Sequence, residues 1–551
     1  MKIIFLFLFV FVFLIPYPQV LASDECLEAT LALGLIRDIA DVEMISIEDV
    51  LDKVCDYLPV ELSEMCLKFV NRYAGDVIQF FMEEDNPDSV AHKLGFCKQL
   101  VCRLYPDEKK KSQRPCSQNT QENKYTPQNL GKDSQLKKSI WDIIKEEINK
   151  IAADHIPLVD LDNDHFVTYK TLRGSNWRGR DCNDVLPGVR PGAVPPNGDL
   201  DYDSNCNGIY GKDDNGVSYE DKFCKDSKPM GVMVFGDSVG AHFHIPPQYL
   251  DAKQVVDGII SKTALHLLEM EADWPHKSYG TGFDTSDNDV CPGPVNSVYL
   301  QMRKINRCNH RNYQNIAVNG MSSHYIIKLI ETTVNKDEQK TSYPTLTFLE
   351  IIGNDICRAK NINDFITPDD FKKKIIEFLD LLDESLAPGS KVITVGFVQG
   401  SILYETLHDH IHPIGHDITY SHLYDYLNCV GASPCRMWMT SNKTHRDAAD
   451  AHSIILNQAY FDIIQDYKPK NFELGYLKFP LKQVEEYFKE NNMDFSTTIE
   501  PVDGFHPSQI GQYYMGTYLW EDLKNKYPDF IPPENPNNEE IEKIFGDQGG
   551  Y

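Results

Sequence analysis

The chain has 551 residues, and 42% of them are hydrophobic, so it is long enough for two or three domains with real cores. It carries 82 acidic against 54 basic residues, which gives a net charge of −28. A chain of this charge repels a phosphate backbone, and we therefore expect no nucleic acid partner.

The first 22 residues have the pattern of a secretory signal peptide. Lys2 precedes an unbroken apolar run from Ile3 to Ile15, and Val20-Leu21-Ala22 offers small residues near a cleavage point. The run is short for crossing a bilayer, so an uncleaved anchor is the less favoured alternative. We expect a protein that is secreted, or that resides in the lumen of lysosomes or endocytic vesicles.

The cysteine content fits this route. The chain has 14 cysteines, and in an oxidising compartment an even number favours disulfides over buried free thiols. Asn442-Lys443-Thr444 is a glycosylation sequon, which belongs to the same route. We therefore expect a glycoprotein with several disulfides.

Residues 23–105 are expected to be helical. Apolar residues recur at steps of three and four from Ile47 to Leu58, and again from Met65 to Ile78. Five cysteines fall within these helices, which predicts a small helical domain stapled by disulfides. They are Cys26, Cys55, Cys66, Cys97 and Cys102. The cysteine spacing and the helical pattern together resemble saposin B-type lipid-binding domains.

The saposin resemblance implies an inner pair, Cys55 with Cys66, and an outer pair, Cys26 with Cys102. The family begins with Cys-x-x-Cys, but Ala29 stands at the second position here. Cys97 is thereby left without its usual partner, and Cys116 or a cysteine of the large domain becomes its candidate. Such domains hold acyl chains against an apolar face and contact a membrane or micelle surface transiently. A helical pro-domain without lipid contact is the alternative.

Residues 106–155 are expected to form a linker. Lys109, Lys110 and Lys111 precede a run rich in Gln, Asn and Thr that lacks apolar periodicity to about residue 140. A basic exposed linker in a secreted precursor suits proteolytic processing. An uncut loop is an equal alternative.

Residues 156–228 are rich in Asp, Asn and Gly, and something other than an apolar core must order them. Oxygen ligands at close spacing suit Ca²⁺, and a cation would offset the mutual repulsion of the carboxylates. We expect calcium to be held by three sets of ligands: Asp160, Asp162 and Asp164 with the carbonyl of Phe166; Asp181, Asn183 and Asp184; and Asp199, Asp203, Asn205 and Asn207 with the carbonyl of Ile209. A solvated acidic loop is the alternative.

Two details qualify the calcium prediction. The first set departs from an EF-hand, because His165 replaces the glycine at position six and Thr171 replaces the glutamate at position twelve. Cys182 and Cys206 lie inside the second and third sets. We expect these two cysteines to pair and to lock the two loops around shared ions.

From residue 229 the pattern becomes α/β. Apolar strands end at Phe235, near Ile352 and near Phe397, and helix-like stretches such as 368–386 and 452–466 lie between them. Near-continuous apolar strands separated by helices imply a parallel sheet with both faces covered. We expect this domain to span residues 229–528, followed by a polar C-terminal tail, 529–551.

Four short blocks predict acyl-transfer chemistry at one edge of that sheet. Ser238 and Asn354 each follow a strand, and parallel strands bring such residues to the same edge. His506 lies three residues after Asp503, where the carboxylate can orient the imidazole that activates the serine. The backbone N–H groups of Ser238 and Gly320 and the side chain of Asn354 are the expected oxyanion donors.

These blocks resemble the SGNH (GDSL-type) esterase and lipase family, whose blocks carry Ser, Gly, Asn and His. The resemblance implies a three-layer α/β/α sandwich and ester hydrolysis through an acyl-enzyme, with Ser238, Asp503 and His506 as the triad. We assign no catalytic role to His242 and His244. The alternating histidines at 408, 410 and 412 are expected to be solvated.

The combination of all three parts resembles the acyloxyacyl hydrolase family, with long local matches such as Trp177–Asp184 and Glu500–Pro507. The resemblance implies removal of secondary fatty acyl chains from the lipid A of bacterial lipopolysaccharide, and action on some glycerophospholipids. It also implies two disulfide-linked subunits cut from one precursor. Cys116 with Cys429 or Cys435 is the candidate bridge, although Cys429 and Cys435 can equally close their own loop. A broader phospholipase or lysophospholipase and a lipid-binding carrier are the alternatives.

Overall fold

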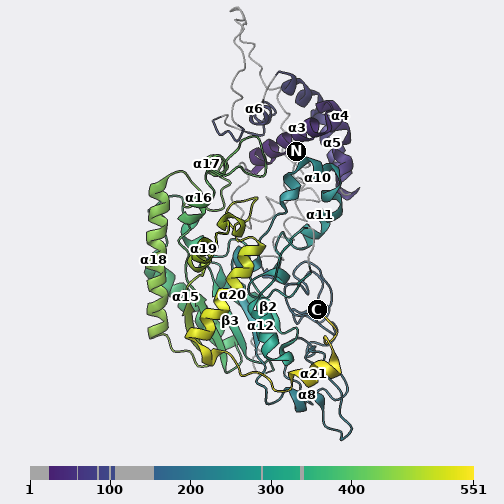
Figure 1. Cartoon of the computed structure of the whole chain (residues 1–551), viewed down its shortest axis with the longest axis vertical. Coiled ribbons are helices and arrows are strands. Elements are labelled where there is room, and N and C mark those ends of the chain that lie inside the picture. The colour runs from purple at the N-terminus through teal and green to yellow at the C-terminus, as the bar shows by residue number, and fades with distance from the viewer. Residues whose placement is uncertain are drawn as a thin grey trace, which may run out of the picture.

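The computed structural model describes residues 24–58, 60–83, 86–97, 101–105, 154–286, 290–334 and 341–551. The predicted signal peptide, 1–22, and nearly all of the predicted linker, 106–155, with Cys116, lie outside the described residues. Figure 1 shows a helical N-terminal domain at one end of the molecule and an α/β domain below it. Within the described ranges, no helix combines the length and the apolar character that a membrane span needs.

The N-terminal domain consists of short and long helices that bury an apolar interior. They are α3 (Asp24–Glu43), α4 (Ile47–Lys53), the 3-10 helix η1 (Val54–Tyr57), α5 (Val60–Met82) and α6 (Pro87–Lys93). Helix α4 begins at a capping box, because Ser46 and Asp49 each accept the other's backbone N–H. Asn86 caps α6, and Pro87 occupies its first turn.

The disulfides of this domain differ in part from the predicted ones. Cys55 pairs with Cys66, which confirms the inner pair. Cys26 pairs with Cys97 and not with Cys102, so the predicted outer pair is wrong. Cys97 lies four residues after the end of α6, which packs against α3, and this packing brings the Cα atoms of Cys26 and Cys97 to 4.5 Å.

Cys102 instead pairs with Cys429 of the α/β domain. The predicted bridges from Cys116 are therefore wrong, since Cys429 has another partner and Cys435 is a buried free thiol. The alternative of a Cys429–Cys435 loop is wrong for the same reason. The link between the two domains is thus covalent, but through a different cysteine of the N-terminal part.

A five-stranded parallel sheet forms the centre of the α/β domain, with strand order β2-β1-β3-β4-β5. The strands are β1 (Gly231–Gly236), β2 (Tyr313–Asn315), β3 (Thr345–Glu350), β4 (Ser390–Val395) and β5 (Phe472–Leu477). The sheet is parallel, as predicted, and β1, β3 and β4 end within two residues of the predicted ends. The apolar pattern had not identified β2 and β5, which are short or partly exposed.

Helices pack on both faces of the sheet because alternate strand residues point to opposite sides. Val232 and Val234 share one apolar cluster with α12 (Val298–Ile305) and α20 (Gln509–Lys526). Met233 and Phe235 share the other with α13 (Ile326–Thr333), α15 (Pro368–Ser385) and α18 (Lys443–Asp466). In Figure 1, α20 and α12 lie in front of the strands, while α15 and α18 lie at the side.

Short elements complete the fold. They are α8 (Tyr219–Phe223), α9 (Ser238–Ala241), η2 (Pro247–Leu250), α10 (Ala252–Val256), α11 (Ile259–Glu269), η3 (Pro275–Lys277), η4 (Arg307–Asn309), α14 (Asn354–Cys357), α16 (Ser401–Leu407), α17 (Tyr420–Val430), α19 (Leu481–Glu490), η6 (Phe495–Thr498), η7 (Pro528–Phe530) and α21 (Asn538–Phe545). Helices α10 and α17 contact α3 and so connect the two domains.

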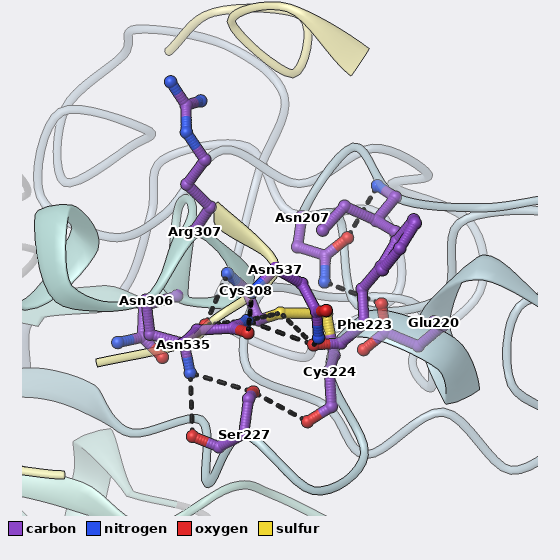
Figure 2. Close-up of a disulfide and its surroundings, with 12 residues drawn as sticks. Asn207, Glu220, Phe223, Cys224, Ser227, Asn306, Arg307, Cys308, Asn535 and Asn537 are labelled. Carbon is purple, nitrogen blue, oxygen red and sulfur yellow. Dashed lines mark hydrogen bonds between the residues drawn. A yellow bond between two sulfur atoms is a disulfide. The ribbon is translucent and has the colours of Figure 1, made fainter. Parts of the chain in front are cut away.

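The C-terminal residues dock on the α/β domain beside a disulfide that the sequence did not predict, Cys224–Cys308. Figure 2 shows how Asn535 is surrounded there: its amide donates to the carbonyl of Phe223 and to the side chain of Asn306, both at 3.0 Å. Ten of the 13 cysteines in the described residues are therefore paired, and the tail is fixed by buried hydrogen bonds despite its polar composition.

Candidate active site

Ser238 lies at the first turn of the short helix α9, directly after β1. Asp237 caps this helix by accepting the N–H of Val239 at 3.0 Å. The backbone passes so close to β3 that a Cβ at Gly236 would lie 2.5 Å from Oε2 of Glu350. The tight strand-to-helix turn therefore fixes where the serine hydroxyl emerges.

The three side chains that the sequence analysis grouped as a triad lie together. Nε2 of His506 is 2.7 Å from Oγ of Ser238, and Nδ1 of His506 is 2.5 Å from Oδ2 of Asp503. The other carboxylate oxygen of Asp503 accepts the N–H groups of Phe505 and His506. Each of the three residues is only 7–8% exposed, so the polar chain is shielded from water.

The two expected oxyanion donors are placed differently. Asn354 lines the same cavity as Ser238, and its amide donates to Oδ2 of Asp237 at 3.2 Å. Gly320 has a positive φ of 74° and lies two residues after Val318, whose N–H bonds the carbonyl of Gly236. Gly320 therefore stands beside the end of β1, although it is not among the residues that line the cavity.

Beneath Ser238, two acidic side chains that sequence reasoning missed meet in the interior. Burial raises the pKa of Asp237 to about 6 and raises the pKa of Glu350 well above its usual value. The negative charge of Asp237 adds to the upward pKa shift of Glu350. Glu350 is the only charged residue of the buried strand β3, and this is the sequence signal that could have identified it.

His244, to which we assigned no catalytic role, is buried beside the residues that carry the base. Its Nδ1 lies 2.6 Å from Oε2 of Glu500, and its Nε2 lies 2.8 Å from the carbonyl of Val290. Burial lowers the pKa of His244, but the carboxylate of Glu500 outweighs this and raises it overall. The contact between His244 and Glu500 joins the segment after Ser238 to the turn that contains His506.

An apolar cavity that is partly open to solvent begins at the serine. Its walls are mainly hydrophobic and aromatic side chains, and its polar members are Asp237, Ser238, Asn354, Thr498 and His506. The apolar members include Val398, Leu403, Trp438, Leu481, Val484, Ile499, Phe505 and Met515. Such a mainly apolar lining suits an alkyl chain.

Comparison with known proteins decides the family. The family described as GDSL-like Lipase/Acylhydrolase matches residues 232–519, and the saposin-like domain family matches residues 25–138. The chain is 37% identical to acyloxyacyl hydrolase of Oryctolagus cuniculus, over 97% of this chain and 95% of the relative. The corresponding values are 35%, 97% and 94% for Homo sapiens, and 34%, 96% and 94% for Mus musculus.

The chain belongs to the acyloxyacyl hydrolase family. It is a GDSL-type acylhydrolase with a saposin-like N-terminal domain. The five disulfides of the described residues agree with the predicted oxidising environment.

In this acyloxyacyl hydrolase homologue, carboxylates of the first two predicted metal sets meet. Two groups have oxygens within 4.8 Å of one another: Asp160, Asp162 and Asp184, and Asp162, Asp164 and Asp181. Four of these side chains, Asp162, Asp164, Asp181 and Asp184, each have one buried oxygen without a hydrogen-bond donor. Burial, helped by the neighbouring carboxylates, raises the pKa of Asp164 to about 8 and of Asp181 to about 7.

Orphaned buried oxygens and raised pKa values indicate that this arrangement fits a cation. Cys182 and Cys206 form the predicted disulfide next to it, so their sulfurs are not ligands. The remaining predicted ligands of the first two sets, Phe166 and Asn183, are hydrogen-bonded to these carboxylates. The N–H of Phe166 donates to Asp164, and the N–H of Asn183 donates to Asp181.

Side chains of the third predicted set of metal ligands form hydrogen bonds with other protein groups. The amides of Asn205 and Asn207 both donate to Glu220, a buried carboxyl that the sequence analysis had not included. Asp199 accepts from Ser204, and Asp203 accepts the N–H groups of Asn207 and Gly208. The N–H of Ile209 bonds Asn207. A metal at this third set stays a prediction.

One of the alternating histidines is not solvated, which corrects that expectation. His412 is 3% exposed, and its Nε2 lies 2.7 Å from the carbonyl of Val502. His410 is exposed, as predicted, and His408 is partly buried. His412 therefore supports the turn before His506 and does not serve as a metal ligand on a loop.

Proposed function

We propose that this chain is a secreted or lysosomal esterase that removes secondary, acyloxyacyl-linked fatty acyl chains from the lipid A of bacterial lipopolysaccharide. The observation that carries the proposal is the continuous contact from Asp503 through His506 to Ser238 at the mouth of an apolar cavity. The chain's membership of the acyloxyacyl hydrolase family selects this substrate among acyl esters.

In the proposed mechanism, Ser238 is the nucleophile and His506 is the base. His506 takes the hydroxyl proton as Oγ attacks the ester carbonyl, and Asp503 stabilises the imidazolium that forms. The same imidazolium then gives the proton to the leaving hydroxyl of the lipid. Water, activated by His506, attacks the acyl-enzyme, and the fatty acid leaves as Ser238 recovers its proton.

The negative charge on the attacked carbonyl oxygen needs fixed donors. We assign the backbone N–H groups of Ser238 and Gly320 and the side-chain amide of Asn354 to this task. Asp237 supports Asn354, as the hydrogen bond from the Asn354 amide to the Asp237 carboxyl group indicates. Loss of one such donor typically costs about 3 kcal/mol in the barrier.

Each remaining part has a role in presenting a lipid. The apolar cavity takes the acyl chain beyond the scissile ester. The saposin-like domain contacts the membrane or micelle surface transiently, and its link through Cys102 and Cys429 keeps it attached after a cut in the predicted linker, 106–155. The two domains then correspond to disulfide-linked small and large subunits of one precursor.

We propose calcium as the cofactor of the Asp-rich segment. Its carboxylates are hard oxygen ligands, and the four orphaned oxygens supply positions that a cation would fill. Asp160, Asp162, Asp164, Asp181 and Asp184 would hold it. The ion would neutralise the buried charge and fix these loops, which pack against the α/β domain, and it has no part in proton transfer.

Fatty-acid release from lipopolysaccharide tests the proposal. The wild-type protein should liberate the secondary acyl chains, identified by mass spectrometry, and Ser238→Ala should release none while keeping its thermal unfolding curve. Release from glycerophospholipids at a higher rate than from lipopolysaccharide would favour a broader phospholipase. If Ser238→Ala kept full biological activity without release, a carrier role would replace the enzymatic one.

A further inference from the structure

The turn that contains Asp503 and His506 is held by side chains from elsewhere in the fold. We call residues 500–506 the catalytic turn. Two of its carbonyl groups accept hydrogen bonds from tyrosines: the hydroxyl of Tyr420 donates to Pro501 at 2.5 Å, and the hydroxyl of Tyr424 donates to Gly504 at 2.7 Å. Both tyrosines belong to α17, so one helix holds the turn at two points.

The contact between α17 and the catalytic turn is tight. Gly504 has a φ of 64°, and a Cβ on it would lie 2.5 Å from the hydroxyl oxygen of Tyr424 and 2.6 Å from the ring of Tyr420. Both rings are buried, at 4% and 0% exposure. The backbone next to His506 therefore rests directly on two rigid aromatic side chains.

The other end of α17 contacts the saposin-like domain. Cys429 in the last turn of the helix is bonded to Cys102. The hydroxyl of Tyr426, also buried, lies 3.9 Å from the sulfur of Cys26 in α3. In the loop before α17, His416 forms an ion pair with Asp38 of the same α3. Figure 1 shows α17 at the boundary between the two domains.

We propose that Tyr420 and Tyr424 are positioning residues for the base His506, and that α17 makes the docked saposin-like domain a structural part of the active site. The inference rests on the proposed function, because it takes His506 to be the base. Its physical reason is the steep dependence of proton transfer on geometry: a misplacement of about 1 Å can cost about 100-fold in rate. On this view the domain affects turnover even of a substrate that needs no lipid surface.

The first test uses a soluble short-chain nitrophenyl ester, which bypasses lipid capture. Tyr424→Phe and Tyr420→Phe each remove one hydroxyl and leave the ring. We expect kcat per folded molecule to fall about 10-fold for each and about 100-fold for the double variant, with KM changed less than about 2-fold. Tyr467→Phe, which removes a hydroxyl that bonds Asp380 away from the turn, is the matched control.

A comparison of kcat per folded molecule with the melting temperature separates a positioning role from a role in stability. A purely structural role would lower the melting temperature of the Phe variants but leave kcat per folded molecule at the wild-type value, and that result overturns the inference. Tyr424→Phe should therefore be compared with Tyr467→Phe by thermal unfolding and by kcat on the same preparation.

The second test concerns the domain contact. A triple variant, Cys102→Ser, Cys429→Ser and Asp38→Asn, loosens the docking of α3 on α17. We expect turnover of the soluble ester to fall at least about 5-fold. A loss confined to lipid substrates overturns the coupling. Ser238→Ala separates the two proposals: residual turnover in Ser238→Ala refutes the proposed function, whereas an inactive Ser238→Ala with wild-type tyrosine variants refutes only this inference.

Discussion

Nε2 of His506 lies 2.7 Å from Oγ of Ser238, although 268 positions separate the two residues in the chain. The parallel sheet contributes to this approach, because Ser238 follows β1 and Asn354 follows β3, and both line one cavity with His506. The relationship gives the serine hydroxyl a base at hydrogen-bond distance and leaves the other ring nitrogen for Asp503.

Asp503→Asn should lower kcat about 10⁴-fold while the fold is kept. The amide that replaces the carboxylate presents an N–H to Nδ1 of His506, so the ring adopts the tautomer that cannot accept the serine proton. Turnover of a soluble ester and thermal unfolding measure the two effects. Asp494→Asn, an exposed helix-cap residue near the turn, is the control. A loss below about 10-fold for Asp503→Asn would contradict its role.

Removal of calcium should destabilise the protein. A ligand present at 100 times its Kd stabilises the folded state by about 2.7 kcal/mol, and a chelator removes this contribution. We expect EGTA to lower the melting temperature by several degrees, excess Ca²⁺ to restore it, and Asp164→Asn to respond less than the wild type. Asp214→Asn, an exposed acid of the same segment, should respond like the wild type. An unchanged melting curve in EGTA would count against calcium.

A larger side chain in the cavity should shorten the preferred acyl chain. Leu403→Trp fills space that an alkyl chain would occupy, so kcat/KM for esters of about 14 carbons should fall more than 10-fold relative to acetyl esters. A series of nitrophenyl esters measures the change. Val217→Trp, at an exposed position that does not line the cavity, should keep the wild-type profile. Equal losses for long and short chains would place the acyl chain elsewhere.

His412 should make the protein less stable in acid. Burial lowers its pKa to about 4 from the ordinary 6.5. Between pH 6.5 and pH 4, His412 is protonated in the unfolded chain but remains neutral in the folded chain. The free energy of unfolding therefore falls as the pH falls from 6.5 to 4. The full shift corresponds to on the order of 3 kcal/mol. The contribution is fully present above pH 6.5.

His412→Gln tests this titration. Glutamine can still donate to the carbonyl of Val502 but does not titrate, so the slope of unfolding free energy against pH should be smaller than in the wild type over this range. Urea unfolding at half-unit pH steps measures it. Identical slopes in the two proteins would show that His412 does not bear the predicted shift.

Local patterns explain what the sequence alone could predict. Apolar runs that end at Phe235 and near Ile352 identified the strands that precede Ser238 and Asn354. A buried parallel strand can be recognised from its own apolar residues, without knowing which strands it pairs with. The contact between Asp503 and His506 was also predictable, because the two residues are only three positions apart in the chain. The same holds for Cys55 and Cys66, which lie 11 residues apart.

Long-range packing explains what the sequence could not predict. Cys26 pairs with Cys97, and Cys102 pairs with Cys429, which lies 327 residues away. The docking of α3 and α17 determines which of these sulfur atoms come into bonding distance. Nothing in the sequence around Tyr420 or Tyr424 distinguishes them from other tyrosines on an amphipathic helix. The docked tail is a further example, since its polar residues find buried partners such as Phe223 only in the folded chain.

Covalent labelling by a fluorophosphonate with an alkyl chain tests the central claim most directly, because the reagent modifies only an activated serine. Mass-spectrometric mapping of the wild-type protein should find one modified residue, Ser238, and His506→Gln should reduce its labelling rate at least about 1,000-fold. A label on another residue, or equal labelling of Ser238 in the two proteins, would contradict the account.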